Sequence, residues 1–188
     1  MSVLDSTIIC SACELTISTS RTWGMFKYRL RIGKTLPIKR TLGWCHSCEN
    51  FTAVEDFSDR SSIHQRISEL ETFLANTLDI DLSKVRQGFE SLDLKTHEQR
   101  RNNAWELDNL KNRIPFFEKR ESPPRCLMCA SIYIVHLRFD PPTEGQGSVR
   151  LGFVNPTCGG SLFIETTSRR INMSLDNIFY DREGRRMK

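Results

Sequence analysis

Seven cysteines, arranged in two groups, are the feature that most constrains how this chain of 188 residues can fold. One group lies between residues 10 and 48, the other between 126 and 158, and the intervening 77 residues contain none. Six of the seven form C-x-x-C pairs, and this pattern with an odd total is typical of metal ligands and not of disulfides. We therefore predict three parts: an N-terminal cysteine module at 1–57, a helical segment at 58–121 and a C-terminal cysteine module at 122–188.

The N-terminal residues and the hydropathy of the chain predict the cellular compartment in which the protein resides. Residues 1–9 lack the basic start and the apolar run of a signal peptide. Nowhere does the sequence approach the roughly 20 consecutive apolar residues that span a bilayer. Together with reduced cysteines, these observations predict a cytoplasmic protein without a membrane partner.

Charge is distributed unevenly along the chain. The formal net charge is +4 for residues 1–54, −3 for 55–122 and +3 for 123–188. Basic cysteine-bearing ends permit a polyanionic partner, although charges of this size also occur on ordinary solvated surfaces.

Hydrophobic periodicity predicts a β-hairpin between the first two cysteine pairs. In the run 26–32, four apolar side chains alternate with Lys27, Arg29 and Arg31, which predicts a strand with one basic face. Gly33 and Lys34 read as a turn, and residues 36–42 as the partner strand that returns toward Cys45.

The middle segment has helical periodicity. Apolar residues predict one amphipathic helix over about 60–78, and Ser62 followed by Gln65 resembles a capping box. The stretch 83–114 is also predicted to be helical, as one helix or two, and Pro115 is expected to end it.

Strand patterns return at 132–139, 149–154 and 162–166, where we expect a short antiparallel sheet. The predicted fold class is therefore α+β, with two small antiparallel β modules flanking an α-helical segment. Such small hydrophobic cores need a metal to hold them.

A four-cysteine site is the strongest candidate for chemistry. Tetrahedral zinc takes four thiolates, and each C-x-x-C pair supplies two from one tight turn. The predicted hairpin lies between two such pairs, so we predict a structural zinc site made of Cys10, Cys13, Cys45 and Cys48. A redox pair beside a βαβ unit and a haem attachment motif both fit the sequence less well. His46, inside the second pair, is expected to be an exposed turn residue.

Residues 8–57 resemble the zinc-ribbon class, in which two cysteine knuckles hold a structural zinc on a small antiparallel sheet. Rubredoxin iron sites use similar knuckles with glycine directly after the second cysteine, where the backbone turns left-handed. Glu14 and Glu49 occupy those places here, and this departure favours zinc over iron.

The C-terminal group offers Cys126, Cys129 and Cys158 for a second metal, with the fourth ligand unknown. The run Asn155-Pro-Thr-Cys158-Gly-Gly resembles a ribbon knuckle in which histidine, a ligand, stands where this chain has Asn155. An amide is a poor zinc ligand, and His136 is expected to lie too far away along its strand. Three interpretations remain open: structural zinc completed by another ligand, a site that has lost its metal, and a catalytic zinc with an open position. No general base motif accompanies the cysteines, which disfavours catalysis.

These patterns predict a non-enzymatic protein that binds one or two Zn²⁺ ions per chain and acts as a protein-recognition or adaptor module. The alternative is a nucleic-acid-binding protein in which Lys27, Arg29 and Arg31 contact phosphates. A metal-dependent enzyme at the three-cysteine site is the third hypothesis. Because alternation places the aromatic residues opposite the basic ones, a solvated strand face accounts for Lys27, Arg29 and Arg31 better than nucleic-acid contact does.

Overall fold

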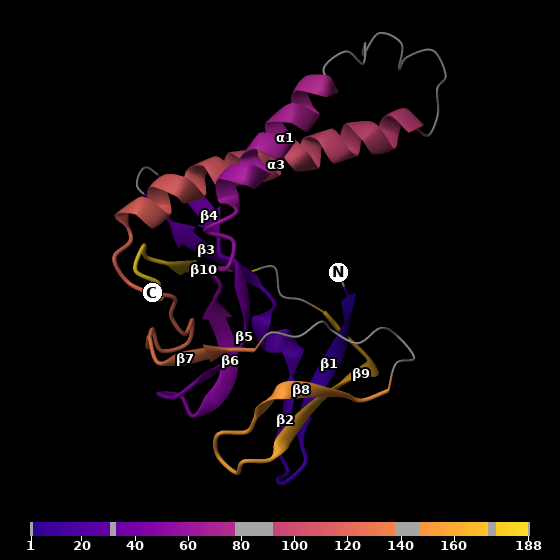
Figure 1. Cartoon of the computed structure of the whole chain (residues 1–188), viewed down its shortest axis with the longest axis vertical. Helices are drawn as coiled ribbons and strands as arrows, with labels where there is room; N and C mark the ends of the chain where they lie inside the picture. The colour runs from indigo at the N-terminus through magenta and orange to yellow at the C-terminus, as the bar shows by residue number, and fades with distance from the viewer. Residues whose placement is uncertain (1, 31–32, 78–91, 138–146, 173–175, 188) are drawn as a thin grey trace. The chain divides into compact units, whose positions relative to one another are not determined.

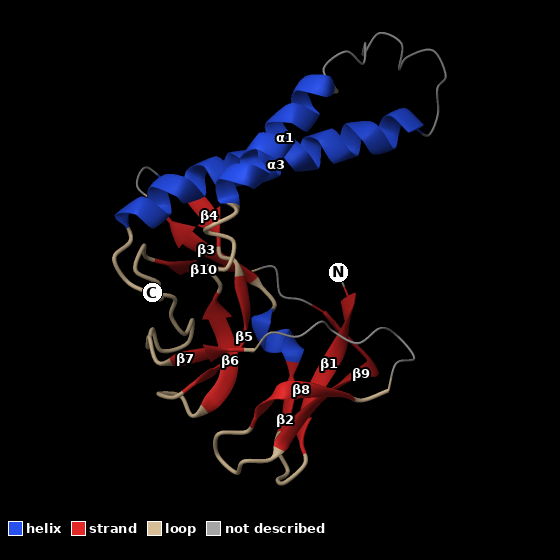
Figure 2. Cartoon of the chain, in the orientation of Figure 1, coloured by secondary structure: helices blue, strands red, loops and turns tan. Residues whose placement is uncertain are grey.

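The computed structural model describes residues 2–30, 33–77, 92–137, 147–172 and 176–187, and the chain forms two units. Unit 1 combines Met1–Phe57 with Ser122–Lys188 and contains the strands, whereas unit 2, Ser58–Glu121, contains the α-helices (Figures 1 and 2). The predicted α+β class, with sheets flanking a helical segment in the sequence, is confirmed. The prediction of separate modules at 1–57 and 122–188 is wrong, because the two ends fold into one unit.

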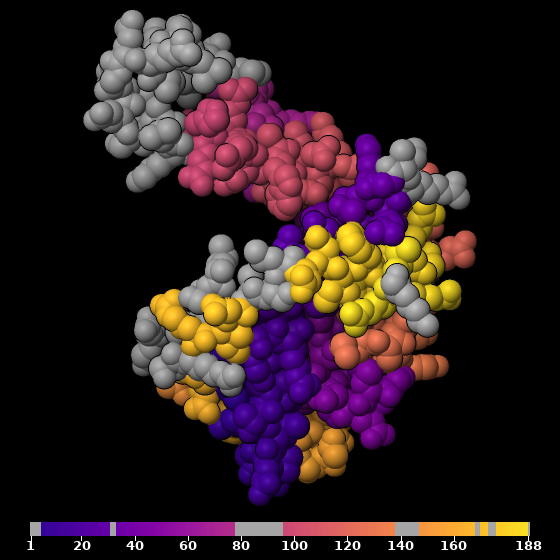
Figure 3. Space-filling view, turned by 180° about the vertical axis from the view of Figure 1, so that it is seen from behind, coloured from indigo at the N-terminus to yellow at the C-terminus, as the bar shows by residue number. Residues whose placement is uncertain are grey.

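A four-stranded antiparallel sheet joins the two ends of the chain. Strand β1 (Ser2–Cys10) pairs with β2 (Thr16–Ser18) on one edge and with β9 (Ser161–Asn172) on the other, and β9 also pairs with β8 (Val149–Val154). Seen from behind, the indigo N-terminal residues lie against orange residues of the C-terminal segment (Figure 3). This pairing joins residues that are 152 (Cys10 and Leu162) to 170 (Ser2 and Asn172) positions apart in the sequence, and it merges the two predicted modules into one unit.

Two three-stranded sheets complete unit 1. In one, β3 (Met25–Arg29) lies between β4 (Thr35–Pro37), which is antiparallel to it, and β10 (Asn177–Tyr180), which is parallel to it. In the other, β5 (Arg40–Cys45) lies between β6 (Asn50–Glu55) and β7 (Ile134–His136), both antiparallel. A 3-10 helix at Thr19–Thr22 connects β2 to β3.

The predicted hairpin is confirmed only in part. Phe26 and Tyr28 are buried while Lys27 is half-buried and Arg29 exposed, as alternation predicted. The return strand ends at Pro37, and the chain then enters β5 in a different sheet. Arg31 lies outside the described residues.

The C-terminal strand predictions fare similarly. Strands β8 and β9 pair as expected. The first predicted strand, 132–139, is represented by β7 alone, and residues 138–139 lie outside the described part of the chain. Strand β7 pairs with β5, where Val135 lies opposite Trp44, and not with β8.

One hydrophobic core holds unit 1 together. It draws buried side chains from both halves of the chain: Ile8, Ile17, Leu42, Trp44, Phe51, Leu137, Leu151, Leu162 and Ile164. Burying each large apolar side chain contributes roughly 1.5–3 kcal/mol, so a shared core is far more stable than two half-sized ones.

Unit 2 is a pair of helices, α1 (Ile63–Asn76) and α3 (Leu92–Lys119) (Figure 1). The helix predicted at 60–78 is confirmed, but the capping box is not, because Ser62 makes no side-chain cap bond and Gln65 donates to Glu69 instead. Residues 83–91 of the second prediction lie outside the described residues.

Helix α3 continues through Pro115 to Lys119, so the prediction that Pro115 ends it is wrong. An interior proline costs about 3 kcal/mol. Burial of the Phe116 and Phe117 side chains, each worth roughly 1.5–3 kcal/mol, offsets that cost. Among the described residues, no helix combines the length and apolarity needed to cross a membrane.

Candidate metal centres

The structure groups the cysteines differently from the sequence prediction. Cys45, Cys48, Cys126 and Cys129 form one cluster, the four-cysteine site, and Cys10, Cys13 and Cys158 form another, the three-cysteine site. Within each cluster the sulfurs lie within 4.8 Å of one another. The predicted set Cys10, Cys13, Cys45 and Cys48 is therefore wrong, and so is the set Cys126, Cys129 and Cys158.

Strand pairing is the physical reason for the regrouping. Cys10 ends β1, whose partner β9 begins just after Cys158. Cys45 ends β5, whose partner β7 begins just after Cys129. The chain passes from one sheet into another between Cys13 and Cys45, so no hairpin brings those two pairs together.

The four-cysteine site has the dimensions of a tetrahedral thiolate shell. Sγ of Cys45 lies 3.6 Å from that of Cys129, and Sγ of Cys48 lies 3.9 Å from that of Cys126. Four sulfurs bonded to one zinc at about 2.3 Å are separated by about 3.8 Å. Cys45 and Cys126 are buried, Cys48 is half-buried and Cys129 is exposed.

Backbone contacts hold the two knuckles of this site. The N–H of Met128 donates to Sγ of Cys126 (3.4 Å), and the N–H of Cys126 to the carbonyl of Ser131 (2.9 Å). The hydroxyl of Ser47, in the other knuckle, donates to that of Ser131 (2.8 Å). These bonds hold the turns in which the four sulfurs gather within 4.8 Å of one another.

The residue after the last cysteine of the knuckle turns left-handed in three of the four knuckles. Glu49 has φ 47°, Ala130 has φ 60° and Gly159 has φ 72°. The sequence prediction took the absence of glycine after Cys13 and Cys48 as evidence for zinc over rubredoxin-like iron. At Glu49 and Ala130 the chain adopts it nevertheless, so this backbone turn does not separate iron from zinc here.

Burial shapes the acidity of the four-cysteine site. It raises the pKa of Cys126 to about 11 and also raises the pKa of Cys48, where neighbouring thiols add to the effect. Thiols must lose their protons to bind metal. Metal binding here is therefore coupled to proton release.

The three-cysteine site is more exposed. Sγ of Cys158 lies 3.4 Å from both Cys10 and Cys13, and both Cys13 and Cys158 are exposed. The N–H of Ala12, helped by the Asn155 amide, holds the pKa of Cys10 down at about 6. A Cβ at Gly160 would lie 2.5 Å from Sγ of Cys10, so only glycine allows this approach.

Asn155 takes the position of the ligand histidine in the knuckle that this segment resembles, and it lies at the three-cysteine site. It is 1% exposed, and its side chain contacts Cys10 and Cys13. His136 belongs to neither cluster, and its Nε2 lies 2.7 Å from the carbonyl oxygen of Glu55. His46 is exposed, as expected.

The basic residues of β3, Lys27 and Arg29, lie on the less buried face of an ordinary strand. The guanidinium of Arg29 lies 4.6 Å from the ring centroid of Phe179 on the neighbouring strand β10, a cation–π contact. Lys27 is half-buried.

Sequence reasoning missed one surface. Met128 is 67% exposed, Tyr133 68%, Ile132 44% and Val135 37%, and all four lie between Cys126 and the end of β7. We call them the knuckle surface. The available signal was the apolar pair Leu127-Met128 inside a knuckle, since the other C-x-x-C pairs enclose small or polar residues.

Comparison with protein-family models, with curated proteins and with solved structures finds no match to this chain. The two clusters of cysteines that could hold metal are consistent with the zinc-ribbon resemblance.

Proposed function

We propose that this is a non-enzymatic zinc protein that recognises another protein through the knuckle surface. The observation that carries the proposal is the exposure of Met128, Ile132, Tyr133 and Val135 beside a four-thiolate site. The four side chains come from the eight-residue stretch 128–135. Where exposed apolar side chains form a patch on a folded protein, they mark an interaction site.

Zinc is the metal that the donor set favours. Four thiolates in tetrahedral spacing suit zinc, and a complete protein shell is typical of structural zinc and not of catalytic zinc. The metal would therefore hold the two knuckles in place and would not take part in catalysis. Iron is the competing metal for the same donor set.

The knuckle surface is presented on a fixed backbone. The N–H of His46 donates to the carbonyl of Tyr133 (3.0 Å). Among the described strands, β7 is an edge strand of its sheet, with β5 as its neighbour. A pre-ordered apolar surface loses little entropy on binding. Tyr and Met are enriched at protein interfaces, and an edge strand can add an extended peptide.

The experiment is selection of a displayed random peptide library on immobilised, zinc-loaded protein. We expect recovered peptides to bind the unmodified protein and to lose at least about tenfold in affinity on a Met128→Ser, Tyr133→Ser double variant. The matched control is Met25→Ser with Trp105→Ser, whose side chains are 39% and 64% exposed elsewhere. Peptides that bind all three proteins equally would refute the knuckle surface as the recognition site.

Nucleic-acid binding is the second candidate, and Lys27 and Arg29 on one face of β3 favour it. Phosphate contacts would make affinity fall steeply between about 50 and 200 mM salt. Fluorescence anisotropy with labelled DNA and RNA tests this directly. Binding that is lost with salt and with a Lys27→Ala, Arg29→Ala variant would replace the protein-recognition proposal.

A further inference from the structure

The side chain of Asn155 lies against two of the sulfurs of the three-cysteine site. Its Nδ2 lies 3.3 Å from Sγ of Cys13 and 3.6 Å from Sγ of Cys10. Nitrogen or oxygen bonded to zinc at about 2.0 Å, with sulfur at about 2.3 Å, gives a separation of about 3.5 Å at the tetrahedral angle. The amide nitrogen therefore lies at ligand-like distances from two of the three sulfurs.

The hydrogen bonds of Asn155 fix which amide atom faces the sulfurs. The backbone N–H of Thr157 lies 3.0 Å from Oδ1, and because that N–H can only donate, the atom it meets must be the acceptor. The backbone of Asn155 is held by bonds with Gly160 (2.8 Å) and Gly159 (2.7 Å). Nδ2 is thus held toward the sulfurs, and an amide NH₂ donates hydrogen bonds to thiolates without binding metal.

Three thiolates are then the whole protein shell of this site. Among the described residues, no other Cys, His, Asp or Glu side chain joins the cluster. Cys13 and Cys158 are exposed, in contrast to the buried Cys45 and Cys126 of the four-cysteine site. An incomplete and exposed shell binds a metal more weakly and lets competing ligands reach it.

We propose that the three-cysteine site is an exchangeable zinc site, and that Asn155 makes it so by placing a donor instead of a ligand against the sulfurs. The four-cysteine site retains its zinc under conditions in which the three-cysteine site gives its zinc up. This inference rests on the proposed zinc binding and adds a second, weaker class of site to it.

Asn155→Asp is the sharpest test, because it keeps the shape of the side chain. One carboxylate oxygen still accepts from Thr157, and the other replaces Nδ2 beside the sulfurs as a zinc ligand. We measure zinc release to the colorimetric chelator 4-(2-pyridylazo)resorcinol. The unmodified protein should hold two zinc ions and release one readily. Asn155→Asp should raise the zinc affinity of the three-cysteine site on the order of 10- to 100-fold.

Cys158→Ser serves as the matched control, and it should remove the readily released zinc while one tightly held zinc remains. The proposal is overturned if the unmodified protein holds only one zinc, if both zinc ions resist the chelator equally, or if Asn155→Asp holds zinc no more tightly. A gain in affinity cannot come from structural damage. The peptide experiment on the knuckle surface uses other residues, so either proposal can fail alone.

Discussion

At the scale of single residues, the left-handed turns after the cysteines store strain. A non-glycine residue in this conformation costs roughly 1–2 kcal/mol, and Ala130 adopts it at φ 60°. We predict that Ala130→Gly raises the free energy of unfolding of the metal-loaded protein by about 1 kcal/mol, measured by urea denaturation. Ala12→Gly, in a knuckle residue without positive φ, should not stabilise. Equal effects at both positions would contradict the strain argument.

Gly43 is a residue at which a single methyl group should matter. A Cβ there would lie 2.6 Å from Cγ2 of Val54 and 2.7 Å from the carbonyl oxygen of Val135, between the strands that carry the two knuckles. We predict that Gly43→Ala lowers the free energy of unfolding by roughly 1–3 kcal/mol. Gly152, also in a strand, has no atom within 4 Å of the added Cβ. Gly152→Ala should therefore leave stability nearly unchanged, and a loss as large as that of Gly43→Ala would be evidence against this packing.

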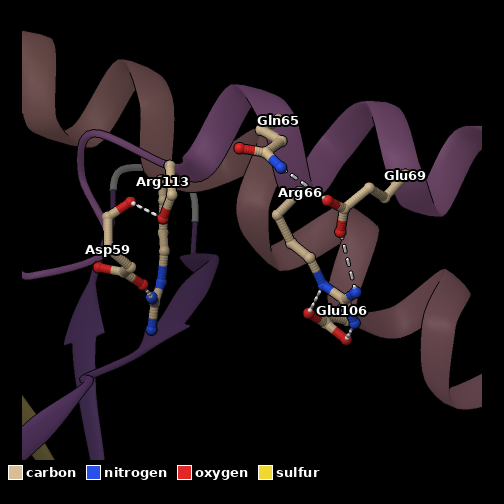
Figure 4. Close-up of polar contacts among 7 residues, drawn as sticks. Asp59, Gln65, Arg66, Glu69, Glu106 and Arg113 are labelled. Atoms are coloured by element: carbon tan, nitrogen blue, oxygen red, sulfur yellow. Dashed lines mark hydrogen bonds and ion pairs between the residues drawn. The ribbon is translucent and has the colours of Figure 1, made fainter.

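At the scale of elements, unit 2 contains ion pairs of different burial (Figure 4). Arg113 and Asp59 are 2.6 Å apart, with side chains 14% and 20% exposed. Arg66 and Glu106 are 2.8 Å apart, with side chains 46% and 38% exposed. The Arg66 guanidinium also holds the pKa of Glu106 below its usual value.

Burial should decide which of these pairs matters. Arg113→Met removes the cation that lies 2.6 Å from the partly buried carboxylate of Asp59 and should cost roughly 1–3 kcal/mol. Arg66→Met removes two solvent-screened pairs, with Glu106 and Glu69, and should cost about 0–1 kcal/mol. Thermal unfolding of both variants measures the difference, and a larger loss for Arg66→Met would contradict this ranking.

The elements show how far the sequence could predict the fold. The α1 helix, the basic face of β3 and the strands β8 and β9 were predictable because periodicity is a local property. Each cysteine knuckle was predictable for the same reason. The end of α3 was not, because burial of residues such as Phe116 overrides local propensity. The capping box at Ser62 was not either, because the Ser62 hydroxyl donates to the carbonyl of Asp59 instead.

At the scale of the whole molecule, the pairing of knuckles was the part that local patterns could not decide. Four knuckles can pair in three ways, and the choice depends on strand contacts between distant segments. One physical signal was available. Two helices packed as a hairpin return the chain to its starting point, so the knuckles that flank the helical segment, at Cys48 and Cys126, are brought together.

The same topology predicts that unit 2 is an insertion in unit 1. The N–H of Glu55 donates to the carbonyl of Arg125 (2.9 Å), so the chain leaves and re-enters unit 1 at neighbouring points. We expect that a linker of about six Gly/Ser residues can replace 58–121. The shortened protein should keep the zinc content of the full chain, measured by elemental analysis. A metal-free or aggregated product would show that the helices are needed to build unit 1.

The central claim is that Cys45, Cys48, Cys126 and Cys129 make one tetrathiolate centre. The most direct measurement is the absorption spectrum of bound Co²⁺ in Cys126→Ser and Cys10→Ser, because the competing set Cys10, Cys13, Cys45 and Cys48 contains Cys10 and excludes Cys126. We predict that Cys126→Ser loses the tetrathiolate spectrum and that Cys10→Ser keeps it. Retention in Cys126→Ser together with loss in Cys10→Ser would contradict the account.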